Sequence, residues 1–140
     1  MRVLIMGLPG SGKTTLAEKL VESYESEGKS VLWLNADKIR TIFNDWDFSE
    51  EGRLRQAMRM RSLCNGSEDE IKIVDFVAPL PQMRDIFAAD FTVWVNTLPK
   101  SRFEDTNSIF IKPTKFDLEV ITKNADYWVE KIKNQIVINK

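Results

Sequence analysis

The chain has 140 residues, of which 43% are hydrophobic and 29% charged, and its formal net charge is −1. This length suits a single domain with one hydrophobic core, and the balanced charge provides no general attraction for nucleic acid or an anionic membrane. One cysteine and no histidine exclude an internal disulfide, a multi-cysteine zinc site and any mechanism based on histidine. A proton acceptor must therefore be a carboxylate or a less usual group.

A phosphate-binding loop follows the first predicted strand, residues 2–6. Residues 7–15 read GLPGSGKTT, and from Thr14 to Tyr24 apolar side chains recur on one helical face. This is the complete G-x-x-x-x-G-K-[ST] pattern in its required context of a strand and a helix. A glycine-rich turn without a ligand is the alternative. We expect an ATP-binding loop in which Lys13 reaches the β- and γ-phosphates and the Thr14 hydroxyl binds Mg²⁺. The predicted ATP-binding residues are Gly7, Leu8, Pro9, Gly10, Ser11, Gly12, Lys13, Thr14 and Thr15.

The second predicted strand, residues 30–34, is followed by Asp37 and a short helical turn over residues 38–43. Ligands of open α/β sheets lie outside the carboxyl ends of the strands, so Asp37 is expected at the same edge as the phosphate loop. A capping role at the surface is the alternative for Asp37.

A helix rich in arginine is predicted from Ser49, a favourable N-cap, to about Leu63. Its spacing places Arg55 and Arg59 together, whereas Arg53 lies nearer another face. Some of these side chains are expected to be solvated. An acceptor that carries sulfate or phosphate would explain the excess, because guanidinium groups bind oxyanions in a bidentate manner. The four arginines are Arg53, Arg55, Arg59 and Arg61.

The third predicted strand, residues 71–77, contains Asp75 in a short pattern that resembles a Walker B aspartate, a further candidate for binding Mg²⁺. Pro81 is predicted to begin a helix that ends at Ala88, since proline is favoured in the first helical turn. Residues 91–95 form the fourth predicted strand.

Residues 96–113 show no clear periodicity, and segments of this length in compact domains are often lids or binding loops. Arg102 is the candidate to cover the nucleotide phosphates, with a charged solvent loop as the alternative. A strand over residues 117–121 and an amphipathic helix over residues 124–136 complete the chain.

Alternating strands and helices predict a three-layer α/β/α sandwich with a mostly parallel five-stranded sheet, the shape of a P-loop nucleotide kinase. We expect residues 1–140 to form one kinase domain with a shortened lid at about residues 98–112. No apolar run approaches the ~20 residues that span a bilayer, and the N-terminus lacks the regions of a secretory signal. A soluble cytoplasmic protein is therefore expected.

Three segments resemble the adenylyl-sulfate kinase family. Residues 35–40 (NADKIR) are similar to the family's D-G-D-N-x-R, and residues 48–59 (FSEEGRLRQAMR) to its F-S-x-x-D-R-x-x-N-x-R-R. Residues 76–81 (FVAPLP) are similar to its F-I-S-P-Y-R. This family phosphorylates the 3′-hydroxyl of adenosine 5′-phosphosulfate (APS) from ATP, so the resemblance implies an ATP-dependent, Mg²⁺-dependent kinase with a small-molecule acceptor.

The resemblance also implies roles for single residues. Asp37 matches a carboxylate near the acceptor hydroxyl and Mg²⁺, which makes it a catalytic candidate beside Lys13 and Arg102. The implied acceptor-binding residues are Asp37, Arg40, Phe48, Arg53, Gln56, Phe76 and Pro79, and the implied metal-binding residues are Thr14, Asp37 and Asp75. Members of this family are often homodimers.

Several positions depart from the family pattern. Asn35 replaces the first aspartate of D-G-D-N, Gln56 replaces an asparagine, and the family's longer lid is reduced to residues 98–110 with only Arg102 as a remnant. These departures leave other acceptors open: a nucleoside, a nucleotide, a metabolite or, disfavoured by the neutral charge, a polynucleotide 5′ end. A protein that binds nucleotide without turnover is the alternative outside the enzymes.

Overall fold

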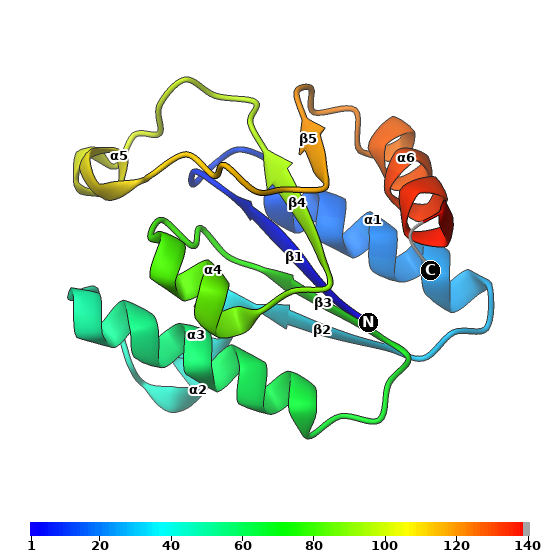
Figure 1. Ribbon diagram of the computed structural model, residues 1–140, viewed down its shortest axis with the longest axis horizontal. Coiled ribbons are helices and arrows are strands. Elements are labelled where there is room, and N and C mark those ends of the chain that lie inside the picture. The colour runs from blue at the N-terminus through cyan, green and yellow to red at the C-terminus, as the bar shows by residue number, and fades with distance from the viewer. Residues whose placement is uncertain (139–140) are drawn as a thin grey trace.

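The computed structural model describes residues 1–138 and shows a five-stranded parallel sheet in the order β2-β3-β1-β4-β5, covered by helices on both faces (Figure 1). The predicted α/β/α sandwich is confirmed, and the sheet is parallel at each of its pairings. The last two residues of the predicted domain lie outside the described residues. The elements are β1 (Arg2–Gly7), α1 (Lys13–Ser26), β2 (Val31–Asn35), α2 (Ala36–Phe43), α3 (Glu50–Asn65), β3 (Ile71–Asp75), α4 (Pro81–Phe87), β4 (Phe91–Val95), α5 (Glu104–Ile109), β5 (Leu118–Val120) and α6 (Ala125–Ile138).

Each face of the sheet has its own apolar core. On one face α1 and α6 pack together, and the side chains of Leu20 and Ile132 are fully buried there. On the other face α2, α3 and α4 bury Met60, Cys64 and Phe87. Because both faces are covered, the central strand β1 is apolar at every position from Val3 to Met6.

Parallel strands bring their carboxyl ends to one edge, and this edge carries the polar residues. Asn35 at the end of β2 lies beside Asp75 at the end of β3, and Asp75 lies beside Ile5 of β1. Gly7 at the end of β1 lies beside Val95 of β4. The Asp75 carboxylate and the Asn35 amide therefore lie at the same edge of the sheet as the start of the phosphate loop.

The structure departs most from the predicted elements in the third strand and in the segment over residues 96–113. The third strand ends at Asp75 and not at residue 77, because Ala78 adopts a left-handed backbone with φ 47° and turns the chain away from the sheet. The segment over residues 96–113 contains the short helix α5, which lies apart from the sheet in Figure 1.

No helix within residues 1–138 is long and apolar enough to cross a membrane.

Candidate active site

The phosphate loop joins β1 to α1, and glycine is required where it enters the helix. Gly12 is the N-cap of α1 with φ 103°, a backbone conformation that residues other than glycine rarely adopt. The buried ammonium of Lys13 donates a 2.9 Å hydrogen bond to the Leu8 carbonyl. Burial lowers the pKa of Lys13 to about 8, although the charges of Asp75 and Asp37 oppose this shift. The loop thus holds a cation that forms no ion pair with a carboxylate in the described part of the chain.

Two side chains from distant segments hold the loop from outside. The Thr97 hydroxyl, just beyond β4, donates a 2.7 Å hydrogen bond to the Ser11 carbonyl. The Lys123 ammonium, between β5 and α6, donates a 3.0 Å hydrogen bond to the Gly10 carbonyl. These two carbonyls are therefore occupied by donors from outside the loop, and the Ser11 N–H donates to the Leu8 carbonyl at 3.2 Å, which leaves the other N–H groups of the loop for an anion.

A cluster of polar side chains surrounds Asp75, whose side chain is only 2% exposed. One carboxylate oxygen accepts hydrogen bonds from the Asn35 amide at 2.9 Å and the Thr14 hydroxyl at 3.2 Å. The other accepts the indole N–H of Trp33 at 2.7 Å. Burial raises the pKa of Asp75, and these donors and the Lys13 charge oppose the rise. The carboxylate is therefore fixed in orientation beside Thr14.

A cleft of about 740 Å³ lies above this edge of the sheet and joins the phosphate loop to the acceptor motifs. Ten of the predicted site residues line this cleft with polar, charged or aromatic side chains. These are Lys13, Thr14, Asp37, Arg40, Phe48, Arg53, Gln56, Asp75, Phe76 and Arg102. Pro9, Gly10 and Pro79 also line the cleft.

The remaining phosphate-loop residues lie elsewhere. Ser11, Gly12 and Thr15 line a second cavity of about 130 Å³ behind the loop, together with Lys123 and Trp128. Gly7 and Leu8 line neither cavity. Seven of the nine predicted ATP-binding residues are thus divided between these two cavities, four in the cleft and three in the smaller cavity.

Arg40, on α2, is a buried cation at the acceptor end of the cleft. Its side chain is 4% exposed, and it donates to the carbonyls of Asp45 at 3.0 Å and Asp47 at 3.4 Å. Its guanidinium lies 4.4 Å from the ring centre of Phe48, and that of Arg53 lies 5.3 Å from the same ring. Burial lowers the pKa of both arginines. Neither guanidinium forms an ion pair with a carboxylate within residues 1–138.

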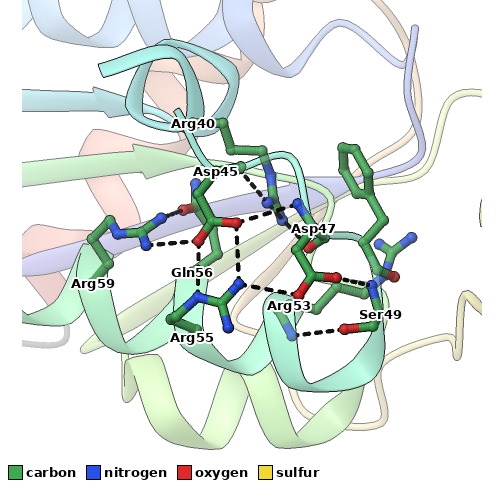
Figure 2. A network of polar contacts seen from close by, with 10 residues as sticks. Arg40, Asp45, Asp47, Ser49, Arg53, Arg55, Gln56 and Arg59 are labelled. Carbon is green, nitrogen blue, oxygen red and sulfur yellow. Dashed lines mark hydrogen bonds and ion pairs between the residues drawn. The ribbon is translucent and has the colours of Figure 1, made fainter. Parts of the chain in front are cut away.

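Two of the other arginines of α3, Arg55 and Arg59, are neutralised by carboxylates of the protein itself, which corrects the prediction that an anionic acceptor explains the excess. Figure 2 shows Asp45 between Arg55 and Arg59, each with a 2.8 Å contact to its carboxylate. Asp47 also pairs with Arg55 at 3.1 Å. These hydrogen bonds hold the pKa of Asp45 far below its usual range. Only Arg53 among the four lines the cleft.

Gly52 allows the segment before α3 to pack closely against this helix, and Gln56 joins α3 to α2. A Cβ atom at Gly52 would collide with Asp47. The aspartate that the family pattern F-S-x-x-D-R has at this position therefore does not fit in this chain. The buried Gln56 amide donates to the Ala36 carbonyl at 3.1 Å and accepts from Arg59 at 2.8 Å. Gln56 lines the cleft, but its polar atoms already hold α2 against α3.

The predicted lid contains an ordered turn. Asn107 accepts from the backbone N–H of Ser101 at 2.9 Å and from its hydroxyl at 2.8 Å, and donates to its carbonyl at 2.8 Å. Arg102 lines the cleft, and its guanidinium lies 5.0 Å from the ring centre of Phe103, which lines the cleft as well. The lid therefore places a cation and an aromatic ring opposite the wall that carries Arg40 and Phe48.

Sequence reasoning did not assign roles to Trp33, Asn35 and Thr97, whose side chains contact the predicted machinery. Trp33 and Asn35 are two residues apart on β2 and so share a face at the strand's carboxyl end. This spacing was the signal that could have placed both beside Asp75. Thr97 offered no comparable signal, because its contact with the phosphate loop joins segments 86 residues apart.

Comparison with known proteins gives a consistent result. A family model described as adenylylsulphate kinase matches residues 1–122. A probable adenylyl-sulfate kinase of Aeropyrum pernix is 30% identical over 98% of this chain and 81% of its own length. The cytidine diphosphoramidate kinase of Campylobacter jejuni is 26% identical over 61% of this chain and 49% of its own length. The APS kinase CysC of Mycobacterium tuberculosis, solved with AMPPNP and APS, has a TM-score of 0.84 at 21% identity over 97% of this chain and 96% of its own, which shows a shared fold.

The parallel sheet, the phosphate loop and the cleft beside it define a P-loop kinase. The extent of the family match makes the assignment narrower: the chain belongs to the adenylylsulphate kinase family. It is accordingly an enzyme of the class that transfers phosphate to a hydroxyl group.

Proposed function

We propose that this chain phosphorylates the 3′-hydroxyl of APS from ATP. The observation that carries the proposal for the acceptor is Arg40, a buried guanidinium that lines the cleft and has carbonyl oxygens but no carboxylate as partners within residues 1–138. A buried cation without an anionic partner is unfavourable, and an anionic acceptor group would relieve that cost. The exposed ring of Phe48 beside Arg40 offers a surface for a nucleoside base.

The cleft supports a role for each predicted residue. The phosphate loop and Lys13 would hold the ATP phosphates, and Arg102 would cover them from the lid. Asp37, which is exposed to the cleft and forms no ion pair within the described chain, would orient the acceptor hydroxyl. Arg53, Gln56, Phe76 and Pro79 would form the rest of the acceptor wall. Catalysis by such a site depends on positioning and charge neutralisation, because phosphoryl transfer requires little covalent chemistry from the protein.

The donors beside the phosphate loop fit Mg²⁺. The Thr14 hydroxyl and the Asp75 carboxylate lie 3.2 Å apart, and Mg²⁺ in kinases usually takes one or two protein oxygens and completes its shell with phosphates and water. Residues 1–138 contain no group of three or more histidine, cysteine or acidic side chains suited to hold a metal. Thr14 and Asp75 would therefore hold the ion with the nucleotide, and the ion would neutralise phosphate charge.

The test is transfer from [γ-³²P]ATP to APS in the presence of Mg²⁺, with the product identified by mass. Formation of the 3′-phosphorylated nucleotide supports the proposal. ATP binding without transfer to APS would contradict it for this acceptor.

A second acceptor, cytidine diphosphoramidate, is favoured by one specific observation. The Campylobacter jejuni relative is named for that acceptor, and this chain differs from the APS kinase pattern at Asn35 and in its lid. Both acceptors are anionic nucleotides that Arg40 and Phe48 could hold. Parallel assays with the two acceptors at equal concentration distinguish them by their kcat/KM.

The affinity for ATP is expected to fall as the pH rises through 8. The free protein has a Lys13 pKa of about 8, and bound phosphates would raise it, so ATP binds preferentially to the protonated form. Above pH 8 binding must take up a proton, which weakens the affinity about tenfold between pH 7 and pH 9. Calorimetry in two buffers of different ionisation enthalpy measures both the affinity and the proton uptake. A pH-independent dissociation constant would contradict this assignment.

Arg40→Lys is expected to raise the KM for the acceptor about tenfold to a hundredfold and to leave the KM for ATP within about twofold. Lysine keeps the positive charge, but it cannot form the planar fork that holds two carbonyls and a bound anion together. Steady-state kinetics with each substrate varied in turn measures the difference. Arg61→Lys is the matched control, because Arg61 lies on α3 outside the cleft. Equal changes in both KM values would show that Arg40 is not specific to the acceptor.

A further inference from the structure

Arg84, on α4, joins two segments that are far apart in the sequence. Its guanidinium donates to the carbonyl of Ala78 at 2.9 Å, to that of Pro79 at 3.3 Å, and to that of Ile111, which follows the lid helix α5. The Ile111 N–H in turn donates to the Pro79 carbonyl at 2.9 Å. The returning end of the lid is thus fastened to the segment after β3.

The segment that Arg84 holds is a wall of the cleft. Ala78 and Pro79 line the cleft, whereas Arg84 does not. Ala78 is buried and has a left-handed backbone with φ 47°, which is unfavourable for a residue with a Cβ atom. A hydrogen bond from a charged donor to the Ala78 carbonyl stabilises this turn. Arg84 therefore fixes the shape of the acceptor wall without touching the acceptor.

The Arg84 guanidinium is held by carbonyl oxygens and not by a carboxylate of the described chain. Within residues 1–138 it forms no ion pair, its partners are carbonyl oxygens and the ring of Phe110 at 5.5 Å, and burial lowers its pKa to about 10. A guanidinium is the side chain with enough donors in a fixed plane to bind several carbonyls at once. The hydrogen bonds from Arg84 to Ala78, Pro79 and Ile111 offset the free-energy cost of desolvating its charge.

We propose that Arg84 is a positioning residue that fixes the returning end of the lid to the acceptor wall, so that acceptor affinity depends on a side chain outside the cleft. The part of this inference that concerns the acceptor rests on the proposed function. The part that concerns the lid does not, because it follows from contacts within the chain alone.

Limited trypsin digestion tests the lid directly. Lys100 and Arg102 are exposed in the lid and provide cleavage sites, whereas Lys131 on α6 reports general unfolding. In Arg84→Gln we expect cleavage after Lys100 and Arg102 about tenfold faster than in the parent, with cleavage after Lys131 unchanged. Arg84→Lys should behave similarly, because one ammonium cannot reach both Ala78 and Ile111. Asp85→Asn, an exposed neighbour on α4, is the matched control and should match the parent.

Kinetics supplies the second measurement. The KM for the acceptor should rise about tenfold in Arg84→Lys, while the KM for ATP stays within about twofold. Parental lid cleavage and parental acceptor KM would overturn the proposal, as would an equal acceleration after Lys131. If no variant and no parent transfers phosphate to APS, the proposed function fails, and the cleavage rates still decide whether Arg84 holds the lid.

Discussion

Lys13→Ala is expected to lower kcat/KM for phosphate transfer about a thousandfold. Lys13 is the buried cation of the phosphate loop, and within residues 1–138 its ammonium has the Leu8 carbonyl as its single hydrogen-bond partner. Charge develops on the transferred phosphoryl group, so a cation fixed beside it stabilises the transition state. Steady-state and single-turnover rates measure the loss.

The same substitution should not destabilise the fold. Burial lowers the pKa of Lys13, which means that the folded protein holds this charge at a cost. The melting temperature of Lys13→Ala should therefore equal or exceed that of the parent. Lys19→Ala, on α1 away from the cleft where Lys19 pairs with Asp126 of α6 at 3.2 Å, is the matched control and should keep parental activity. A Lys13→Ala variant with the parental rate would refute the kinase assignment of the loop.

The nucleotide half of the site could be predicted from the sequence because its signals are local. The residues of the phosphate loop are contiguous, and the requirement for glycine at residue 12 follows from one backbone angle. Asp75 could be placed beside them because parallel strands bring their carboxyl ends to one edge. Each inference needed only a short segment or a general rule of sheet topology.

The acceptor half could be predicted only in part, because charge pairing depends on which side chains meet in space. The sequence shows four arginines on α3, but it does not show that Asp45 and Asp47 approach from the preceding loop and neutralise Arg55 and Arg59. That approach depends on Gly52, whose role is visible only once the loop is folded. The number of arginines on α3 therefore suggested more cations for a ligand than this helix supplies to the cleft.

The lid was the least predictable element. Helix α5 has six residues, too few for a periodic pattern, and its acidic first turn, Glu104 and Asp105, was the only local signal of a helix. Its turn is fixed by contacts between Ser101 and Asn107, and its end by Arg84. Neither pairing has a sequence pattern, since each depends on how the chain returns to the sheet.

Asp37→Asn is expected to lower kcat about a hundredfold to a thousandfold and to leave the KM for ATP nearly unchanged. Asp37 lies in the first turn of α2 and is exposed to the cleft. It is close enough to Lys13 and Arg40 for its charge to oppose the fall that burial causes in the pKa of each. A carboxylate at this position can accept a hydrogen bond from the acceptor hydroxyl and direct its oxygen toward the phosphorus atom. Single-turnover transfer measures this step without product release.

The stability of Asp37→Asn should remain within about 0.5 kcal/mol of the parent, because Asp37 is exposed and its carboxylate forms no ion pair within residues 1–138. The exposed Asp85→Asn on α4 is the matched control. A parental kcat in Asp37→Asn would remove Asp37 from the mechanism and leave the assignment of Lys13 intact.

Titration with Mg²⁺ separates the two roles open to Asp37. The Thr14 hydroxyl and the Asp75 carboxylate already lie together beside the phosphate loop, and no hydrogen bond within residues 1–138 joins the Asp37 side chain to either. If Asp37 orients the acceptor hydroxyl, the loss of kcat persists at saturating Mg²⁺. If Asp37 binds the metal, excess Mg²⁺ restores much of kcat, because a weakened site can be filled by mass action. Since Asp75 is fixed by Trp33 and Asn35, we expect the loss to persist, with the metal on Asp75 and the acceptor hydroxyl on Asp37.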